Sequence, residues 1–436
     1  MTNKLQPHDS TAPVSVSIVT MGCAKNEVDS LHMGEALGSA GYALIDDAAK
    51  ADCIIVNTCS FIQSATEESL QAIFEAFDLP QVKEGEGKVV VAGCMPARYG
   101  DDLTAALDEA QTFVPCSKED DIVAVLDALF PHRGLAASAP ETAPLYSAYV
   151  KISDGCDRFC SYCTIPYIRG RYHSFTLDEI ERELQACLDR GAREIVLIAQ
   201  DTGRWGTDFD TPSSLAALMA TLAEAHPDTW FRVMYLQPEG VTDELLRTMA
   251  SHDNICSYLG IPFQHVNERI LAAMNRKGSR AAYETLIGHV RALVPGITLR
   301  TTFIAGFPTE TEDEFQEVCD FIEDADLDYI GVFPYSQEEG TVAGRMDGQV
   351  DEDTKEERAR ELRAIADSIS RVRVADRIGT RQDVLVLGRE EDGQLYGRAM
   401  CQAPDVDGVT FVHEGAPGDI VTVTITDTLL YEMEGE

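Results

Sequence analysis

The sequence has few basic residues and no long apolar run. Its 436 residues include 35 lysines and arginines against 74 aspartates and glutamates, which gives a net charge of −39. Such a charge opposes nonspecific binding to phosphate backbones, although a salt-tolerant source would also produce it. No hydrophobic stretch approaches the length of a membrane span, and residues 1–13 form a polar leader without a signal-peptide pattern. We therefore expect a soluble cytoplasmic protein without a membrane segment.

The 12 cysteines are too sparse in a chain of this length to be the disulfide framework of a small secreted domain. Grouped thiols in a cytosolic chain indicate metal or redox chemistry instead. The length suits two or three domains. Composition and pattern divide the chain into residues 14–130, residues 142–374 and residues 375–436, with a linker rich in proline and alanine at residues 131–144.

The first segment alternates short β-branched runs with helical stretches, a rhythm that predicts a small parallel sheet covered by helices. Cys23, Cys59 and Cys94 each follow one of its first three strands. Because the carboxyl ends of parallel strands share one edge of a sheet, these thiols should converge into a three-thiolate site. Cys53 begins a strand and should be a buried, inert thiol, so Cys53 and Cys116 serve as controls for the trio. The alternative is that all three are ordinary packing cysteines.

Residues 153–166 carry three more cysteines in a C-x3-C-x2-C spacing: Cys156, Cys160 and Cys163. A structural zinc site or a fully ligated cubane normally takes four protein ligands. Three thiolates on one loop therefore leave one metal corner open for a substrate or cofactor. Clustered thiolates favour iron-sulfur or zinc. The alternative is a structural zinc ion that takes His173 as its fourth ligand.

Six short strands separated by helical sequence follow between residues 149 and 336. Six is too few for a complete eight-stranded barrel, so we expect an open six-stranded β/α barrel whose active face lies at the carboxyl ends of the strands. Arg169 and Arg171 could offer guanidinium groups to a carboxylate, and Glu194 begins a strand and could equally be a surface charge. Polar residues that should line the active face are Gln200, Asp201, Thr202, Gln237, Gln264, His265 and Gly306–Pro308.

A long helical stretch from Asp351 to about Arg377 leads to a last segment of short alternating strands, which predicts a small β-barrel of the oligonucleotide-binding type. Residues 375–436 contain thirteen acidic and four basic residues, a net charge of −9 over 62 residues, against −30 for the other 374. This domain is nearly twice as acidic per residue as the rest of the chain. A basic protein partner therefore suits it better than a nucleic acid.

The order of these parts and several motifs resemble the methylthiotransferases of the radical S-adenosylmethionine superfamily over nearly the whole chain. The motifs are M-G-C-A-K-N-E-V-D-S, N-T-C-S-F-I, G-C-M-P-A-R-Y, S-D-G-C-D-R-F-C-S-Y-C-T-I-P, I-A-Q-D-T and G-F-P-T-E-T-E-D-E-F. Within the family, K-N-x-V-D-S and A-Q-D-T-x3-G are similar to the branch that modifies a ribosomal protein. The tRNA branch usually has asparagine at the position of Asp201. One departure is Phe175, where many relatives have arginine, so no substrate role is assigned to that position.

The resemblance implies two 4Fe-4S clusters and S-adenosylmethionine as cofactors. Cys156, Cys160 and Cys163 would hold the cluster that binds S-adenosylmethionine, and Cys23, Cys59 and Cys94 would hold an auxiliary cluster that carries the transferred sulfur. The implied reaction adds a methylthio group to the β-carbon of an aspartate in the small-subunit ribosomal protein uS12, with flavodoxin or ferredoxin as electron donor. The residues expected to bind S-adenosylmethionine are Tyr162, Gln200, Gln237 and Gln264, and no catalytic side chain is assigned.

Two other functions are compatible with parts of this pattern. A tRNA adenosine methylthiotransferase would use the same chemistry, but it needs a basic terminal barrel to hold the RNA backbone, and the charge count argues against one. A non-catalytic metal-binding adaptor of the translation machinery would need a fourth protein ligand at each trio. The sequence offers no well-spaced candidate for that ligand.

Overall fold

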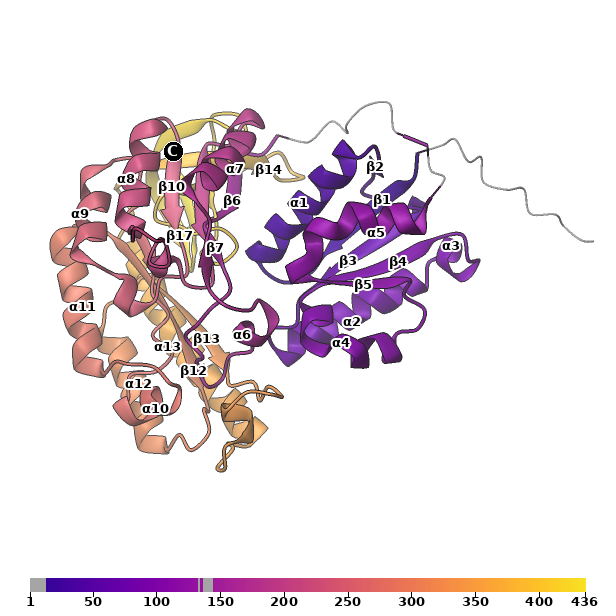
Figure 1. Ribbon diagram of the computed structural model, residues 1–436. Coiled ribbons are helices and arrows are strands. Elements are labelled where there is room, and N and C mark those ends of the chain that lie inside the picture. Colours follow the sequence, from indigo (N-terminus) through magenta and orange to yellow (C-terminus); the bar gives the residue numbers. More distant parts are fainter. Residues whose placement is uncertain (1–12, 132–133, 136–143) are drawn as a thin grey trace, which may run out of the picture. The chain divides into compact units, whose positions relative to one another are not determined.

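The computed structural model describes residues 13–131, 134–135 and 144–436 (Figure 1). Nearly all of the predicted leader and most of the predicted linker lie outside these described residues. Two compact units make up the chain. The first unit comprises Met1–Thr142 and Cys163–Arg171, and the second comprises Ala143–Tyr162 and Tyr172–Glu436.

A five-stranded parallel sheet forms the centre of the first unit, with the strand order β2-β1-β3-β4-β5. Its strands are β1 (Ser15–Thr20), β2 (Ala43–Leu44), β3 (Cys53–Thr58), β4 (Lys88–Gly93) and β5 (Thr112–Pro115). The sequence predicted β1, β3 and β4 but omitted β2 and β5, because strands of two and four residues are too short to show a clear period.

Helices cover both faces of this sheet (Figure 1). Apolar residues of α1 and α5 pack on one face, and those of α2 and α4 pack on the other. Because both faces are covered, β3 is buried along its whole length and reads as a nearly continuous apolar run. The helices of this unit are α1 (Ala24–Ser39), α2 (Gln63–Phe77), α3 (Pro80–Lys83), α4 (Cys94–Ala106), α5 (Ile122–Leu129) and α6 (Ile165–Ile168), with short 3-10 turns at Ala48–Lys50 and Cys116–Asp121.

Six parallel strands in chain order form an open barrel in the second unit, as predicted. Backbone hydrogen bonds of 2.8 Å from Phe231 to Asn254 and from Cys256 to Phe231 join its two halves. The strands are β6 (Ser147–Lys151), β9 (Glu194–Ile198), β10 (Trp230–Val233), β11 (Tyr258–Gly260), β12 (Thr298–Ala305) and β13 (Tyr329–Pro334), and a two-stranded hairpin, β7 (Ser153–Asp154) and β8 (His173–Ser174), accompanies them.

The helices between these strands begin at well-formed caps. A capping box opens α7 at Thr176 and another opens α12 at Thr311, and Asp351 caps α13. The cap at Thr311 gives the T-E-D-E part of the motif after β12 a structural explanation. The helices are α7 (Leu177–Asp189), α8 (Leu215–Ala225), α9 (Asp243–Ser251), α10 (Glu268–Ala273), α11 (Arg280–Leu293), α12 (Glu312–Asp324) and α13 (Glu352–Ala375). Of the helices in the described residues, none has the length and apolarity to cross a membrane.

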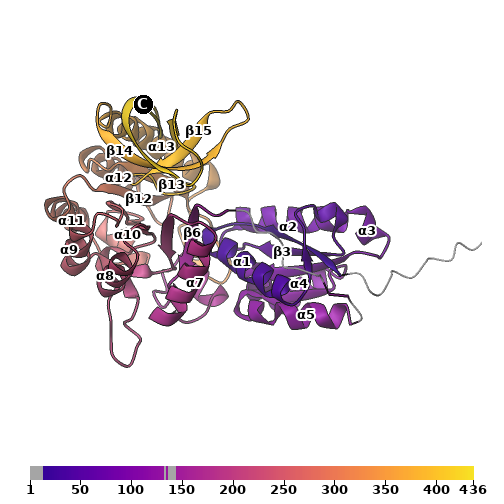
Figure 2. The same ribbon diagram turned by 90° about the horizontal axis from the view of Figure 1, so that it is seen from above.

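The chain ends in a closed five-stranded barrel with the strand order β14-β15-β16-β18-β17. It packs beside α13 (Figure 2), where the Tyr431 hydroxyl donates a 2.6 Å hydrogen bond to Asp367. This confirms the predicted terminal β-barrel. The strands are β14 (Arg381–Arg389), β15 (Leu395–Ala399), β16 (Thr410–Val412), β17 (Ile420–Leu429) and β18 (Glu432–Gly435).

Buried polar contacts fix this terminal barrel to the amino ends of the larger barrel's strands. The Glu194 carboxylate, at the start of β9, accepts a 2.9 Å hydrogen bond from Arg232 and another from Arg398 of β15. Arg232 also donates to the Met400 carbonyl at 3.0 Å. Burial alone would raise the pKa of Glu194, but the two guanidinium groups outweigh it and lower that pKa to about 2. Glu194 is therefore a buried residue that joins the two barrels. The interpretation of Glu194 as a surface charge is wrong.

A second group of contacts strengthens the same junction. Asp407 accepts hydrogen bonds of 2.6 Å from the Tyr258 hydroxyl and from Arg300. Arg377 donates a 3.0 Å hydrogen bond to Asp328. Tyr258 begins β11 and Arg300 lies near the start of β12, so the terminal barrel closes the end of the larger barrel opposite its carboxyl-end face.

Candidate metal centres

Three strand ends of the first unit bring Cys23, Cys59 and Cys94 to one edge of the sheet. Cys23 follows β1 as the N-cap of α1, Cys59 follows β3, and Cys94 begins α4 directly after β4. All three are free thiols; Cys59 and Cys94 are buried and Cys23 is exposed. Cys59 lies within electrostatic range of the other two. The edge predicted from the sequence is therefore where the three cysteines lie.

Two glycines show how closely the three loops approach one another. A Cβ atom on Gly22, beside Cys23, would lie 2.7 Å from the Cys59 sulfur. A Cβ atom on Gly93, beside Cys94, would lie 2.5 Å from the carbonyl oxygen of Thr58. Both glycines have φ near +95°, a region that side chains other than glycine rarely adopt. The small residues that precede these cysteines are thus required by close backbone packing around the site.

The side chain of Asn26 contacts all three loops. No role for this side chain was predicted from the sequence. Its side-chain amide donates to the carbonyls of Met21 and Thr58, at 3.0 and 2.9 Å. Its side-chain oxygen Oδ1 lies 3.7 Å from the Cys94 sulfur and accepts a 2.8 Å hydrogen bond from Arg169. The K-N pair of the first motif therefore supplies a structural link for the trio.

Arg169 enters the same site from the later segment of the unit. One terminal nitrogen lies 2.7 Å from the Asp29 carboxylate and 3.9 Å from the Cys94 sulfur. Both charged side chains are buried. The sequence suggested that Arg169 could bind a carboxylate, and the structure identifies that carboxylate as Asp29.

Cys116 is a fourth thiol at this edge, so its use as a remote control was wrong. It follows β5, the short strand that the sequence analysis omitted, and donates to the Ile168 carbonyl at 3.4 Å. A hydrogen bond from Cys116, together with Arg169, holds the pKa of the Cys94 thiol below its ordinary value despite burial. Cys53, by contrast, begins β3 at the opposite edge, and burial raises its pKa to about 12. Only Cys53 is a suitable control.

The three cysteines of the C-x3-C-x2-C loop, called the loop trio below, are divided between the two units. Cys156 and Cys160 belong to the second unit, whereas Cys163 begins the segment assigned to the first. Burial raises the pKa of the Cys156 thiol. Cys160 lies within hydrogen-bonding reach of Arg276, which also donates to the Pro262 carbonyl at 2.6 Å.

Side chains of the barrel hold this loop in place. Arg158, between Cys156 and Cys160, pairs with Asp201 at 2.6 Å and with Glu239 at 3.1 Å. The Asn275 amide donates to the carbonyls of Arg158 and Phe159, at 3.1 and 3.0 Å. Asp201, the residue that separates the two family branches in the sequence, thus acts on the cluster loop through Arg158.

The predicted cofactor-binding residues lie around the loop and beyond the strand ends. Tyr162 packs against the barrel core, Gln200 follows β9, Gln237 precedes a 3-10 turn after β10, and Gln264 follows β11. Gln264 has φ of +70°, a strained value of the kind that often marks a functional loop. These positions agree with the predicted face, and the binding roles of the four residues stay predictions.

Other residues of that face have structural partners. His265 is fully buried, 3.4 Å from Glu310, which also pairs with Arg358 at 2.8 Å and accepts from the Gly306 backbone at 3.1 Å. The Thr202 hydroxyl donates to the Met234 carbonyl. His173, the alternative zinc ligand, is exposed on β8 and stacks edge-on with Phe175.

The donor sets suit the cofactors that the sequence predicts. Both trios offer soft thiol ligands, and the buried oxygens Gln200 Oε1 and Asp201 Oδ1 have no hydrogen-bond partner within the described chain, so both can accept from a ligand. As the side chains stand, no three His, Cys, Asp or Glu groups in residues 13–131, 134–135 and 144–436 are close enough to hold a metal ion.

Three family descriptions match successive parts of the chain. The descriptions that match are Uncharacterized protein family UPF0004 at residues 15–115, the Radical SAM superfamily at residues 150–322 and a TRAM domain at residues 378–436. The middle match identifies a radical S-adenosylmethionine enzyme, which carries a further domain on each side of its core. Its cofactors are S-adenosylmethionine and iron-sulfur clusters, as the sequence predicted.

Curated relatives narrow the class to one family. The chain is 39% identical to ribosomal protein uS12 methylthiotransferase RimO of Trichlorobacter lovleyi, over 98% of both chains. It is 38% identical to the protein of the same name from Geobacter sulfurreducens, over 98% of this chain and 99% of the relative. The chain therefore belongs to the ribosomal protein uS12 methylthiotransferase family.

Solved structures share the fold at much lower identity. The radical S-adenosylmethionine methyltransferase TsrM from Kitasatospora setae is 15% identical, with a TM-score of 0.53 over 74% of this chain and 75% of that one. The cobalamin-dependent enzyme OxsB is 14% identical, with a TM-score of 0.51 over 82% of this chain and 56% of that one. These likenesses confirm the predicted fold class.

Proposed function

We propose that this chain adds a methylthio group to the β-carbon of an aspartate in ribosomal protein uS12. The observation that carries the proposal is its near full-length similarity to uS12 methylthiotransferases, with both cysteine trios in place. The alternatives, a tRNA methylthiotransferase and a non-catalytic adaptor, are not favoured by these relatives. The corresponding domains are residues 14–130, 142–374 and 375–436.

The six cysteines are the proposed ligands of two 4Fe-4S clusters. Cys156, Cys160 and Cys163 would hold the cluster at which S-adenosylmethionine binds, and Cys23, Cys59 and Cys94 would hold the auxiliary cluster. Together with S-adenosylmethionine, these groups supply hydrogen abstraction, sulfur and the methyl group. The remaining work of the chain is to fix the cluster loop, bind the cofactor and exclude water.

Some residues of the larger barrel are proposed to bind the cofactor, and others are proposed to orient the loop. Gln200, Gln237, Gln264 and Tyr162 are the proposed contacts to S-adenosylmethionine. The buried oxygen of Gln200 can accept a hydrogen bond from an amino group or a hydroxyl group. Arg158 does not bind the cofactor in this proposal; paired with Asp201, it orients the loop between the first two cysteines.

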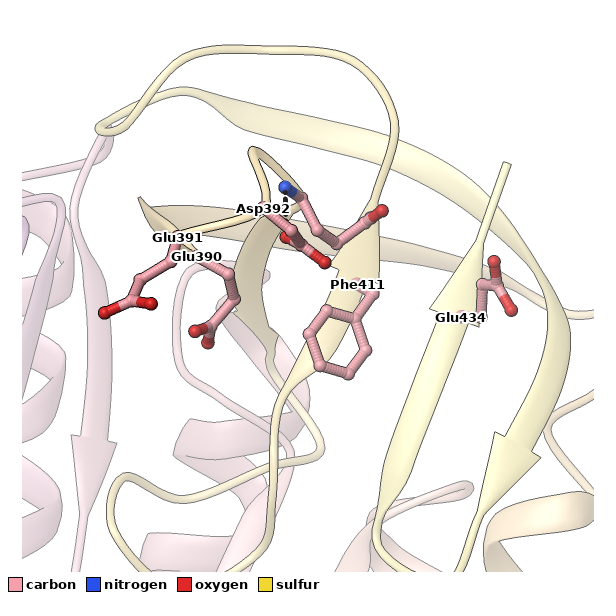
Figure 3. Close-up of a pocket in the computed structure, with 6 residues that line it drawn as sticks. Glu390, Glu391, Asp392, Phe411 and Glu434 are labelled. Atoms are coloured by element: carbon pink, nitrogen blue, oxygen red, sulfur yellow. Dashed lines mark hydrogen bonds between the residues drawn. The ribbon is translucent and has the colours of Figure 1, made fainter.

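The terminal barrel is the proposed docking surface for the basic ribosomal protein. Glu390, Glu391, Asp392, Gln394, Phe411 and Glu434 line an open pocket on it (Figure 3). Two of the domain's four arginines, Arg377 and Arg398, pair with Asp328 and Glu194 of the larger barrel. The surface is therefore still more acidic than the net charge of the domain suggests, which suits a basic partner.

We further propose that the enzyme acts in the cytoplasm and receives electrons from a flavodoxin or ferredoxin. The test of the whole proposal is mass spectrometry of ribosomal protein uS12 and of tRNA from cells with and without the gene. A methylthio mass increment on an aspartate of uS12, present only when the gene is intact, is the expected result. An increment on tRNA adenosine with unmodified uS12 would contradict it.

A further inference from the structure

Arg169 is placed to act on a proposed ligand of the auxiliary cluster. One terminal nitrogen lies 3.9 Å from the Cys94 sulfur, 2.8 Å from the side-chain oxygen Oδ1 of Asn26 and 2.7 Å from the Asp29 carboxylate. Asn26 also accepts from Cys94 at 3.7 Å. This nitrogen carries two hydrogens, and its shorter contacts to Asp29 and Asn26 use both. The guanidinium therefore acts on the sulfur mainly through its charge.

A purely structural ion pair is a weak explanation for this arrangement. The side chains of Arg169 and Asp29 are each only 3% exposed, so both charges have lost their hydration. Replacing a buried pair with apolar residues is often neutral or stabilising, which makes such a pair poor evidence for stability alone. An arginine cannot give up its proton at any ordinary pH, so a positive charge is always present beside Cys94.

A positive charge at this point has a definite effect on an iron-sulfur cluster. A cluster held by thiolates gains one negative charge on reduction, and the potential depends on nearby charge and on hydrogen bonds to the sulfurs. Groups outside the ligand shell tune metal ligands in this way. In a buried site with little screening, a positive charge favours the reduced state.

We propose that Arg169 is a positioning residue of the auxiliary centre, whose positive charge beside the Cys94 sulfur makes the bound cluster easier to reduce. Asp29 opposes this effect, because its carboxylate balances part of the positive charge. The inference rests on the proposed function, since it takes Cys94 as a cluster ligand.

Arg169 also helps to anchor its own segment, and the test must separate the two roles. The Thr164 hydroxyl donates to the Phe61 carbonyl at 3.0 Å, and Phe61 lies two residues beyond Cys59. The segment from Cys163 to Arg171 is thus attached to this unit at more than one point. If Arg169 only anchored this segment, its replacement would weaken iron binding. It would not shift the reduction potential in any particular direction.

The sign of the potential shift is the decisive measurement. The full chain is prepared with Cys156, Cys160 and Cys163 replaced by alanine, so that the auxiliary cluster alone is observed by electron paramagnetic resonance during a redox titration. Arg169→Gln should make the midpoint potential more negative, by a change on the order of tenfold in the reduction equilibrium, or about 59 mV for one electron. Asp29→Asn should move it the opposite way.

Arg171→Gln is the matched control, because Arg171 is exposed two residues further on in the same segment. It should leave the potential unchanged. Shifts of the same sign in Arg169→Gln and Asp29→Asn, or no shift in either, would overturn the proposal. Should the triple-alanine chain fail to fold, the titration can follow, in the chain with all six cysteines, the signal that S-adenosylmethionine does not perturb.

A loss of iron in Arg169→Gln is also informative. If Arg169→Lys then keeps the iron and a potential near that of the parent, the charge is what matters and the proposal stands. If glutamine, lysine and the Asp29→Asn change all lose the iron equally, Arg169 is only an anchor. Failure of this inference leaves uS12 modification by the wild type intact, whereas failure of the proposed function would show as unmodified uS12.

Discussion

The two cysteine trios reach the same number of thiols by different routes. Cys156, Cys160 and Cys163 lie within eight residues of one loop, so the sequence spacing alone brings them together. Cys23, Cys59 and Cys94 are brought together only by three parallel strands that end at one edge. A local motif and a tertiary one can therefore serve the same proposed chemistry, but they should fail in different ways when changed.

A shared feature makes the comparison sharper. Each trio has a guanidinium beside one of its cysteines: the half-buried Arg276 beside Cys160 in the loop, and the buried Arg169 beside Cys94 at the sheet edge. The loop is held by barrel side chains, whereas the sheet-edge trio is held by Asn26 and by glycines that allow close backbone approach. Similar electrostatics are thus built on unrelated local folds.

The largest expected effect comes from deleting either trio. Anaerobically prepared enzyme should carry about eight irons per chain, as two four-iron clusters require. Alanine at Cys156, Cys160 and Cys163 should halve the iron and abolish cleavage of S-adenosylmethionine. Alanine at the sheet-edge trio should also halve the iron but leave cleavage to 5′-deoxyadenosine intact, while product formation is lost.

Iron analysis and chromatography of the cleavage products check this prediction. Cys53→Ala is the control, because Cys53 lies at the opposite edge of the sheet and should keep both clusters. Either triple variant that retained the full iron count would show that its cysteines are not the ligands.

A smaller effect should separate the two trios at single residues. Cys94→Ala should lose only part of the auxiliary iron, because the Cys116 thiol lies beside it and can take its place. Cys94→Ala combined with Cys116→Ala should lose all of that iron, and Cys116→Ala alone should lose none. Cys160→Ala has no such neighbour in its loop motif and should lose its cluster outright. Iron per chain and the cluster absorbance measure all four variants, and equal loss in the single and double variants would remove Cys116 from the argument.

The loop trio and much of the fold could be predicted from the sequence because their signals are local. The C-x3-C-x2-C spacing needs no tertiary structure, and parallel strands place Cys23, Cys59 and Cys94 by a general rule. Cys116 was misjudged because β5 has only four residues, so its strand pattern was too short to detect.

The partners of Arg169 and Glu194 could not be predicted in the same way. Arg169 meets Asp29 across 140 positions of sequence, and Glu194 meets Arg398 across 204. No spacing rule connects residues so far apart, and a single charged residue at a strand start reads equally as surface or core. Buried polar pairs of this kind become visible only when the elements that carry them are packed.

The third prediction concerns Glu194→Gln, which should destabilise the larger barrel but not the sheet that carries Cys23, Cys59 and Cys94. Glu194→Gln should cost about 3–5 kcal/mol, because two buried guanidinium groups lose their counter-charge. Hydrogen exchange should rise in β9 and β15 but stay unchanged in β1 and β3. Glu224→Gln, at an exposed surface pair on α8, is the control and should cost at most about 1 kcal/mol.

The lowered pKa of Glu194 also predicts that the stability of the folded chain depends on pH. The pKa of this carboxylate is about 2 in the folded chain, below the ordinary value of 4.5. The stabilisation is therefore complete above about pH 4.5 and is lost as the pH falls toward 2. Urea unfolding of cluster-free protein should show the difference between wild type and Glu194→Gln shrinking over that range. A difference that stayed constant down to pH 3 would contradict the assignment.

The smallest effect is expected from a change that touches neither trio. Reversing Glu390, Glu391, Asp392 and Glu434 to lysine removes the acidic pocket of the terminal barrel. Asp405 is left unchanged, because its carboxylate accepts a hydrogen bond from Tyr149. Since long-range charge acts mainly on association rate, methylthiolation of uS12 should slow severalfold at low salt and less at high salt. Cleavage of S-adenosylmethionine without substrate should keep its rate, because the terminal barrel attaches to the amino ends of the strands and the loop trio follows a carboxyl end.

A charge-matched variant decides whether location or total charge matters. Lysine at Glu84, Glu86, Asp101 and Asp102, four exposed acids of the first unit, changes the net charge of the chain by the same amount. If the pocket is the docking surface, only the first variant should slow, and its deficit should fall as salt is added. Equal slowing of both variants would mean that overall acidity attracts the ribosomal protein. If both variants modify uS12 at the wild-type rate, the pocket is not the docking surface. If the wild-type enzyme also binds tRNA more tightly than uS12, an RNA substrate is favoured.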